Sequence, residues 1–395
     1  MNILFLGYWS ANDPLSSATI LPHLSILGTI DTIDKIVYCS IEREENTSDK
    51  IPITQTGIKH IPLHSKTRSL LILTKIGDFF LLKKSLYKII RSEKIDKVLT
   101  RGVLAGALIL PVCKKLGIPL FVESFEPHSQ YMLYAGTWKK WYLRYIFQKR
   151  WEEKLKRYAL GIMPVSHNYG KRILQEGVHQ QKVKVVPCAV NMERFGYSNN
   201  LARRLREKLG WGNKIIGIYV GKFGDIYYDL HAFQIFRKAF DFFGDDLRVI
   251  ILSEVSKIAV VRKLSNVGID KANVLVTQAS YDEVPQFLMA ADFGFCLVRP
   301  TATSQYCSPI KNGEYWAAGL PILIPENIGD DSEIIAREGG GAVFDARDEE
   351  SIGKALGVIA NIIDDPDHRN RISSLAGKHR NFSVVENAYR YFLLS

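Results

Sequence analysis

Short apolar segments of strand length alternate with amphipathic segments of helical length along nearly the whole chain. Stretches such as 231–243 and 283–292 have the pattern of helices. Because parallel strands need a crossover connection, this alternation predicts mostly parallel sheets with helices on both faces, and hence an α/β fold of doubly wound, Rossmann-like sheets. We expect ten strands, at residues 3–9, 35–41, 97–102, 119–124, 160–166, 215–223, 247–254, 273–278, 293–298 and 321–325.

The length of the chain favours two such domains. A chain of 395 residues is too long for one ordinary hydrophobic core. An apolar run ends within residues 185–200 and a polar, helix-forming stretch follows, so we place the domain boundary near residue 190. Ligands of such sheets bind at the carboxyl ends of the strands, and two facing domains would hold one in a central cleft.

Composition argues against several classes of protein. The five cysteines are scattered, without a C-x-x-C pair or a histidine at ligand spacing, which disfavours a zinc site and a disulfide framework. The N-terminal segment MNILFLGYWS has the pattern of a buried strand and lacks the basic region and cleavage site of a signal peptide. The longest apolar runs are too short to span a bilayer. We therefore expect a cytoplasmic protein.

Residues 307–323, CSPIKNGEYWAAGLPIL, combine charged side chains with the start of a helix. Ser308 and Pro309 suit the N-cap and first helical positions. The positive end of the helix dipole there would attract an anion, and Lys311 in the first turn would add a full charge. Glu314, one turn on, could accept hydrogen bonds from a diol such as ribose. The alternative is a solvated lysine–glutamate pair on an ordinary amphipathic helix.

A second strand end in the same half of the chain carries a cation. The apolar run IIGIYV leads into Gly221 and Lys222 and then into another helix. A glycine at this point allows close backbone approach to a ligand. Together with Lys311, Lys222 would supply two cations for one diphosphate, whereas alone it would be an exposed lysine in a plain strand-to-helix turn.

Three polar residues mark strand ends in the first half of the chain. Arg101 and Glu123 each end an expected strand, and His128 follows Glu126 in the loop after the second of them. We take Arg101, Glu123 and His128 as candidate catalytic residues, because strand ends of both domains would line a shared cleft. A lone loop histidine is more often a surface or structural residue.

The order of five motifs over nearly the whole chain resembles the retaining, GT-B-fold glycosyltransferases of family four, as a divergent branch. These motifs are VVPCAVNMERF, YVGKFG, AADFGFCLV, SPIKNGEYWAAGLPIL and AGKHRNFSVVENAYRYFLL. The resemblance implies two Rossmann-like domains, an acceptor-side domain at 1–190 and a nucleotide-sugar domain at 191–370. It also implies that the last segment, 371–395, crosses back onto the first domain.

The resemblance also implies roles for single residues. Lys222 matches the cation that contacts the donor diphosphate, Glu314 the glutamate that binds the nucleotide ribose, and His128 the histidine that contacts the donor sugar. The sequence departs from the family where a first motif glutamate and a second diphosphate cation would stand, at Tyr306 and Tyr227. Lys311 is expected to supply the missing cation.

The implied activity is transfer of a sugar from a nucleotide-diphosphate sugar to a glycan or a polyprenyl-linked acceptor, in bacterial surface polysaccharide biosynthesis. By resemblance the anomeric configuration is retained. No D-x-D motif stands in a strand-end loop to hold a metal ion, and a helix N-terminus with basic side chains can stabilise a leaving diphosphate. We therefore expect neither a metal nor a cofactor.

Charge is unevenly divided between the halves of the chain. Residues 1–195 carry 29 Lys and Arg against 16 Asp and Glu, whereas residues 196–395 carry 23 against 25. Trp138, Trp141, Tyr142 and Tyr145 recur at helical spacing within the basic stretch 138–157, and residues 66–94 share its bias. Such a stretch can lie on an anionic membrane surface, which would make the protein peripheral on the inner face of the cytoplasmic membrane. Alternatively the aromatic rings pack on the sheet and the charges are solvated.

Two other functions stay open, and a third class is disfavoured. Sugar-nucleotide 2-epimerases share the GT-B fold, and the tyrosines at 306 and 227 would also suit a transferase-like scaffold without activity. Nucleic-acid binding is disfavoured, because the basic residues lie among aliphatic stripes and no nucleic-acid-binding module is recognisable.

Overall fold

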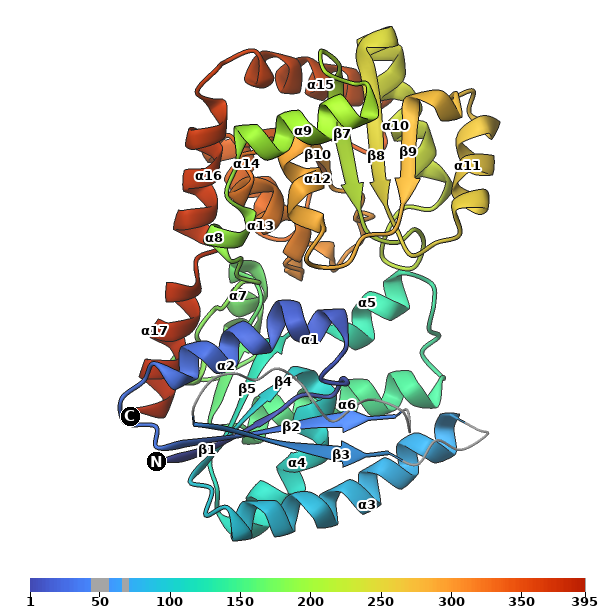
Figure 1. The fold of residues 1–395 in the computed structure, drawn as a ribbon. Coiled ribbons are helices and arrows are strands. Elements are labelled where there is room, and N and C mark those ends of the chain that lie inside the picture. Colours follow the sequence, from blue (N-terminus) through green and yellow to red (C-terminus); the bar gives the residue numbers. More distant parts are fainter. Residues whose placement is uncertain (44–56, 66–70, 395) are drawn as a thin grey trace. The chain divides into compact units, whose positions relative to one another are not determined.

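The computed structural model describes residues 1–43, 57–65 and 71–394. They form two units (Figure 1): the first is Met1–Ser129, Lys140–Pro187 and Phe382–Ser395, and the second is Gln130–Lys139 and Cys188–Asn381. The sequence places the boundaries at 190 and 370. The second boundary differs because α16 (His368–His379) packs on α13 (Ile310–Ala317) of the second unit, so that the segment that returns to the first unit starts later.

The first unit contains a six-stranded parallel sheet in the order β3-β2-β1-β4-β5-β6. The central strand is fully buried from Ile3 to Leu6, as expected of a strand covered on both faces. The strands are β1 (Asn2–Leu6), β2 (Lys35–Glu42), β3 (Ile58–His64), β4 (Lys97–Arg101), β5 (Leu120–Phe125) and β6 (Gly161–Pro164).

Helices cover both faces of this sheet. One face carries α4, which packs on β4 and β5 and contacts α3 and α6. On the other face α2 contacts β2 and α17 (Figure 1). The helices are α1 (Pro14–Thr19), α2 (Leu21–Gly28), α3 (Leu71–Ser92), α4 (Gly102–Leu116), α6 (Leu143–Tyr158), α7 (His167–Gln175), the 3-10 turn η1 (Gln180–Lys182) and α17 (Phe382–Leu393); α5 (His128–Tyr134) begins in this unit and ends in the second.

The second unit contains another six-stranded parallel sheet, in the order β12-β11-β10-β7-β8-β9. In both sheets the strand order turns back beside the first strand, as in doubly wound folds. The strands are β7 (Ile215–Val220), β8 (Leu247–Leu252), β9 (Val274–Thr277), β10 (Phe293–Phe295), β11 (Ile322–Pro325) and β12 (Gly341–Phe344).

Two hydrophobic cores flank the second sheet. One contains Tyr315 and Trp316 of α13, and the other contains Tyr219, Phe236 and Phe295. The remaining helices and 3-10 turns are α8 (Met192–Phe195), α9 (Asn199–Leu209), α10 (Leu230–Phe243), η2 (Gly244–Asp246), α11 (Lys257–Asn266), η3 (Lys271–Asn273), α12 (Val284–Ala290), η4 (Ser304–Tyr306), α14 (Asp331–Glu338) and α15 (Glu349–Ile363).

The structure confirms the predicted fold class and contains a strand in each of the ten expected segments. It adds two strands that the sequence pattern did not indicate, β3 and β12, each at the edge of its sheet. In the part of the chain that the structure describes, none of the helices is both long and apolar enough to cross a membrane.

Candidate functional site

The helix α13 begins one residue later than the sequence predicts. Pro309 is the N-cap, without a side-chain capping hydrogen bond, and Ile310 is the first helical residue. Ser308, which the sequence predicts as the N-cap, has another role: its Oγ accepts hydrogen bonds from the Cys188 backbone N–H, at 3.0 Å, and from the Arg380 guanidinium. Ser308 therefore anchors the loop before the helix and does not cap it.

A buried ion pair also holds the start of α13 in place. The Arg380 guanidinium also pairs with the Asp331 carboxylate, and both side chains are at most 3% exposed. The second carboxylate oxygen of Asp331 accepts a hydrogen bond of 2.8 Å from the Asn312 amide. The first turn of α13 is thus fixed from α14 and from the segment after α16, and the side chains that it presents are held in place.

Lys311 is the buried cation of this turn. The residue is 8% exposed, and its Nζ has no hydrogen-bond partner among the described residues. Its ammonium group lies 4.2 Å from the ring centroid of Tyr227 and 4.8 Å from that of Tyr219. Burial lowers the pKa of Lys311 to about 8. Two aromatic rings offset only part of the cost of burying an ammonium group.

Gly221 brings the end of strand β7 directly against this amine. A Cβ atom at residue 221 would lie 2.5 Å from the Lys311 Nζ, and the φ angle of +144° is one that only glycine adopts readily. Glycine at this strand end therefore makes room for the Lys311 ammonium group, and its predicted approach to a ligand stays a prediction.

Glu314 follows on the same helix. The residue is 8% exposed, and its carboxyl group makes no hydrogen bond within the part of the chain that the structure describes. Burial raises the pKa of Glu314 to about 7, although the charges of Lys311 and Arg194 act in the opposite direction. Arg194 lies over the Tyr281 ring, at 4.1 Å from its centroid, and pairs with Asp282. Lys311 and Glu314 thus form a pair of buried groups that both titrate near neutral pH.

Lys222 differs from Lys311 in its surroundings. Its side chain is 56% exposed and its Nζ lies 2.9 Å from the Asp225 carboxylate. The sequence predicts both lysines as donor-binding cations. The structure separates them into a buried cation without a counter-ion and an exposed cation that already has one, and water screens the charge of the second.

The candidate catalytic residues Glu123 and Arg101 lie in a buried network of the first unit. The Glu123 carboxylate accepts from Arg101 at 2.7 Å, contacts His23 Nδ1 at 3.0 Å and accepts a hydrogen bond from the Tyr389 hydroxyl. Burial alone would raise the pKa of Glu123, but the charges of His23 and Arg101 and the hydrogen bonds hold it at about 2. Since both oxygens are occupied, this geometry favours a structural role for Glu123 and Arg101, joining α2 and α17 to β5.

His128 is the first residue of α5 and is half-buried. Its backbone N–H donates to the Glu126 carbonyl at 2.9 Å. Burial and the nearby Glu152 raise the pKa of the Glu126 carboxyl group to about 7, and no described residue forms a hydrogen bond with it. From the sequence, Glu126 was one of the residues after a buried strand that could reach the cleft, and its position there was the one signal for it.

The sequence did not predict two further residues of the candidate site. Tyr219 and Arg194 stand in a buried strand and in a short helix, where an aromatic residue and an arginine are ordinary. Among the described residues no group of three or more His, Cys, Asp or Glu side chains could hold a metal ion.

Comparison with known proteins supports the family resemblance. Residues 46–194 match the model of Glycosyltransferase Family 4. The chain resembles the GT-B glycosyltransferases of family four. No curated protein sequence matches it.

Solved structures with the GT-B fold are similar over the whole chain. HepE from Anabaena, in complex with UDP, has a TM-score of 0.73 at 13% identity, with 100% of each chain covered. Sucrose-phosphate synthase from Thermosynechococcus elongatus has a TM-score of 0.76 at 12% identity, covering 100% of this chain and 99% of that one. A putative UDP-N-acetylglucosamine 2-epimerase from Listeria monocytogenes has a TM-score of 0.64 at 13% identity, covering 100% and 97%. At these identities the likeness shows a shared fold.

Proposed function

We propose that the protein is a glycosyltransferase that moves a sugar from a nucleoside-diphosphate sugar to an acceptor hydroxyl, with retention of the anomeric configuration. The observation that carries the proposal is the Lys311 ammonium group, which is buried against Gly221 and the Tyr227 ring and has no hydrogen-bond partner among the described residues. By the family resemblance, residue 227 is where a second diphosphate cation would stand. The Lys311 ammonium group lies 4.2 Å from the centroid of the Tyr227 ring, which supports Lys311 as the cation that takes this role.

A diphosphate suits this site on electrostatic grounds. The positive end of α13 and the Lys311 ammonium group both favour an anion, and Gly221 places no side chain against that amine. Glu314, one turn further along α13, is placed to accept hydrogen bonds from the ribose diol of the same nucleotide. Lys222 keeps its predicted role as a second cation, which would exchange Asp225 for the diphosphate.

In the proposed reaction the bond between the anomeric carbon and a diphosphate oxygen breaks, and the acceptor oxygen bonds to that carbon on the same face. The proton of the acceptor hydroxyl passes to the departing diphosphate, so no protein base is required. The Lys311 ammonium group stabilises the negative charge that develops on the leaving group, because it is already in place and shielded from water. The residues present supply this stabilisation without a metal ion.

We propose a glycan or polyprenyl-linked acceptor and a role in surface polysaccharide biosynthesis, at the inner face of the cytoplasmic membrane. The basic first half of the chain supports an acceptor at an anionic surface. The two crystal structures of HepE, with UDP and with UDP-glucose, support a nucleotide sugar as the donor.

Donor binding and turnover test the proposal separately. Thermal-shift and calorimetric screening against UDP-, GDP-, ADP-, dTDP- and CMP-sugars should reveal one class that binds, and the Lys311→Met variant should lose that binding. Release of the nucleoside diphosphate only when a lipid-linked acceptor is added would support transfer. Conversion of the donor sugar without an acceptor would instead indicate the epimerase, and binding without turnover on any acceptor would indicate an inactive scaffold.

A further inference from the structure

The outer faces of α3 and α6 carry large apolar side chains that solvent reaches. Trp141 is 70% exposed and Leu143 73% exposed, at the start of α6, and Phe80 on α3 is 72% exposed. We define the α3–α6 surface by these residues and their exposed or half-buried neighbours: Phe80, Leu81, Lys83, Lys84, Trp141, Leu143, Ile146, Phe147, Arg150, Lys154 and Arg157.

The two helices form one continuous surface. The Phe79 ring of α3 lies 5.2 Å from the Phe147 ring and 5.6 Å from the Trp151 ring of α6, between centroids. Lys83 lies over Phe79 and Lys154 lies over Trp151, at 4.3 and 4.5 Å. Burial and the charge of Lys154 lower the pKa of Lys83, as expected for two cations that lie over neighbouring aromatic rings.

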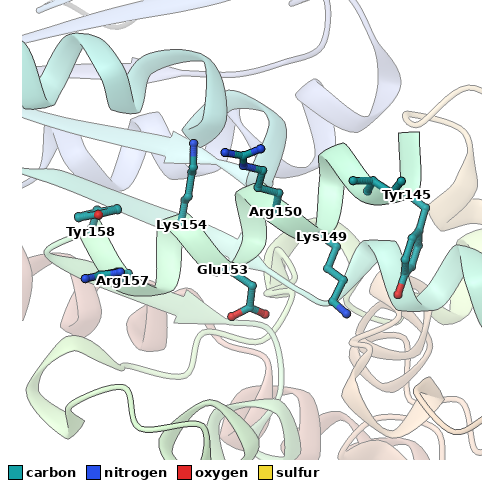
Figure 2. Close-up of a pocket in the computed structure, with 8 residues that line it drawn as sticks. Tyr145, Lys149, Arg150, Glu153, Lys154, Arg157 and Tyr158 are labelled. Atoms are coloured by element: carbon teal, nitrogen blue, oxygen red, sulfur yellow. The ribbon is translucent and has the colours of Figure 1, made fainter. Parts of the chain in front are cut away.

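A shallow hollow follows the outer side of α6. It has a volume of about 590 Å³ and is lined by α6 residues alone. Figure 2 shows the Arg150 and Lys154 side chains extending from the same side of the helix. Its wall carries four basic side chains and one acidic side chain, Glu153, with aromatic and aliphatic edges. This lining suits a phosphate headgroup with an acyl chain beside it.

The charge of the surface has one sign. The helix α6 carries six basic residues and two acidic ones. One of the acidic residues, Glu152, is buried against Ser129, and the other, Glu153, pairs with Lys156. Arg150, Lys154 and Arg157 on the outer face therefore meet little negative charge from their own helix.

We propose that the α3–α6 surface binds an anionic lipid bilayer, with Trp141, Leu143 and Phe80 entering the headgroup layer and the basic side chains contacting lipid phosphates. The α3–α6 surface would make the membrane contact of the proposed function. The biological meaning of this inference therefore rests on the proposed function. Interfacial helices have this composition, with large apolar side chains beside lysine and arginine.

Other occupants suit the surface less well. A second copy of the chain would bring two basic surfaces together, and like charges repel. A protein interface has a centre depleted in charge, whereas here cations stand among the apolar side chains. Nucleic acid would match the cations but would leave Leu81, Leu143 and Ile146 exposed without a partner.

Co-sedimentation of the full-length protein with vesicles tests this inference. The protein should bind vesicles of phosphatidylcholine and phosphatidylglycerol in equal parts at low salt, and much less to phosphatidylcholine alone or at high salt. The Arg150→Gln/Lys154→Gln variant should bind about 30-fold more weakly, since each basic side chain near an anionic surface contributes about 1 kcal/mol. A Trp141→Ser/Leu143→Ser variant should lose a similar factor or more.

Matched controls come from exposed residues of the second unit. Leu230→Ser/Ile258→Ser and Arg203→Gln/Lys257→Gln remove the same kinds of side chain elsewhere and should leave vesicle binding unchanged. The melting temperature and the donor-induced thermal shift should be preserved in all four double variants, so that failure of membrane binding is distinct from failure of the donor site. No binding to anionic vesicles, equal binding to neutral ones, or an equal loss in the control variants would overturn the inference.

Discussion

Replacing Lys311 with methionine should stabilise the free protein while it removes donor binding. Burial lowers the pKa of Lys311 from 10.5 to about 8, so between these values the unfolded chain binds more protons than the folded one, and the free energy of unfolding rises with pH. At pH 7 the charged amine therefore destabilises the fold by about 3 kcal/mol, at about 1.4 kcal/mol for each pKa unit. Methionine has a similar length and no charge, and it removes this penalty.

Differential scanning calorimetry with and without the donor measures both effects. For a unit of this size, about 3 kcal/mol corresponds to a rise in melting temperature on the order of 5 to 10 °C. Loss of one partner from a buried charge pair costs about 2 to 5 kcal/mol, so the donor dissociation constant should increase roughly 30-fold or more.

The exposed neighbour Lys222 provides the matched control for Lys311. Lys222→Met removes a solvated cation that pairs with Asp225, so the melting temperature should change little and donor binding should weaken only moderately. A Lys311→Met protein that melts at a lower temperature and keeps its donor-induced shift would refute the reasoning, because the ammonium group would then be a structural one.

Three further outcomes are expected. Donor affinity should rise with pH through 7 as Glu314 ionises and fall above pH 8 as Lys311 loses its proton. Calorimetry should show that the Glu314→Gln variant lacks the rise in affinity through pH 7. A pH-independent affinity in the wild type would contradict this. Gly221→Ala should weaken donor binding by about 10-fold or more, because its Cβ meets the Lys311 amine, whereas Gly224→Ala, with open space around its Cβ, should affect only the melting temperature. Glu123→Gln should lower the free energy of unfolding by about 3 kcal/mol, and the variant should lose less stability than the wild type as pH falls from 4.5 towards 2. Unchanged stability in urea titrations would argue against the buried network.

Sequence patterns predicted the buried strands and the edge strands β6 and β9, and missed the edge strands β3 and β12 for a physical reason. Central parallel strands are covered on both faces and read as continuous apolar runs. The edge strand β3, IKHIPLH, contains a proline and two histidines, which an edge position tolerates because one side of the strand makes no ladder hydrogen bonds. The edge strand β12 has four residues and follows two glycines, so its pattern is that of a turn.

The candidate site was predictable where a role depends on local chain geometry. Gly221 and the first turn of α13 followed from strand-end and helix-start patterns. Ser308 accepts a hydrogen bond from Arg380, 72 residues away, and Glu123 accepts one from Tyr389, 266 residues away. Pairings over such separations leave no periodic trace in one sequence, so the sequence patterns indicated candidate roles for both residues and did not indicate these contacts.

The position of α17 in the chain has a consequence for biosynthesis. The Tyr389 hydroxyl and the Phe392 ring complete the interior of the first unit, against Glu123 and Phe121. On the ribosome these residues emerge only after every strand of the second unit has been made. The amino-terminal half must therefore wait for the last helix to complete its interior and to supply one of the hydrogen bonds to Glu123, and a nascent chain stalled before Phe382 should be an early client of chaperones.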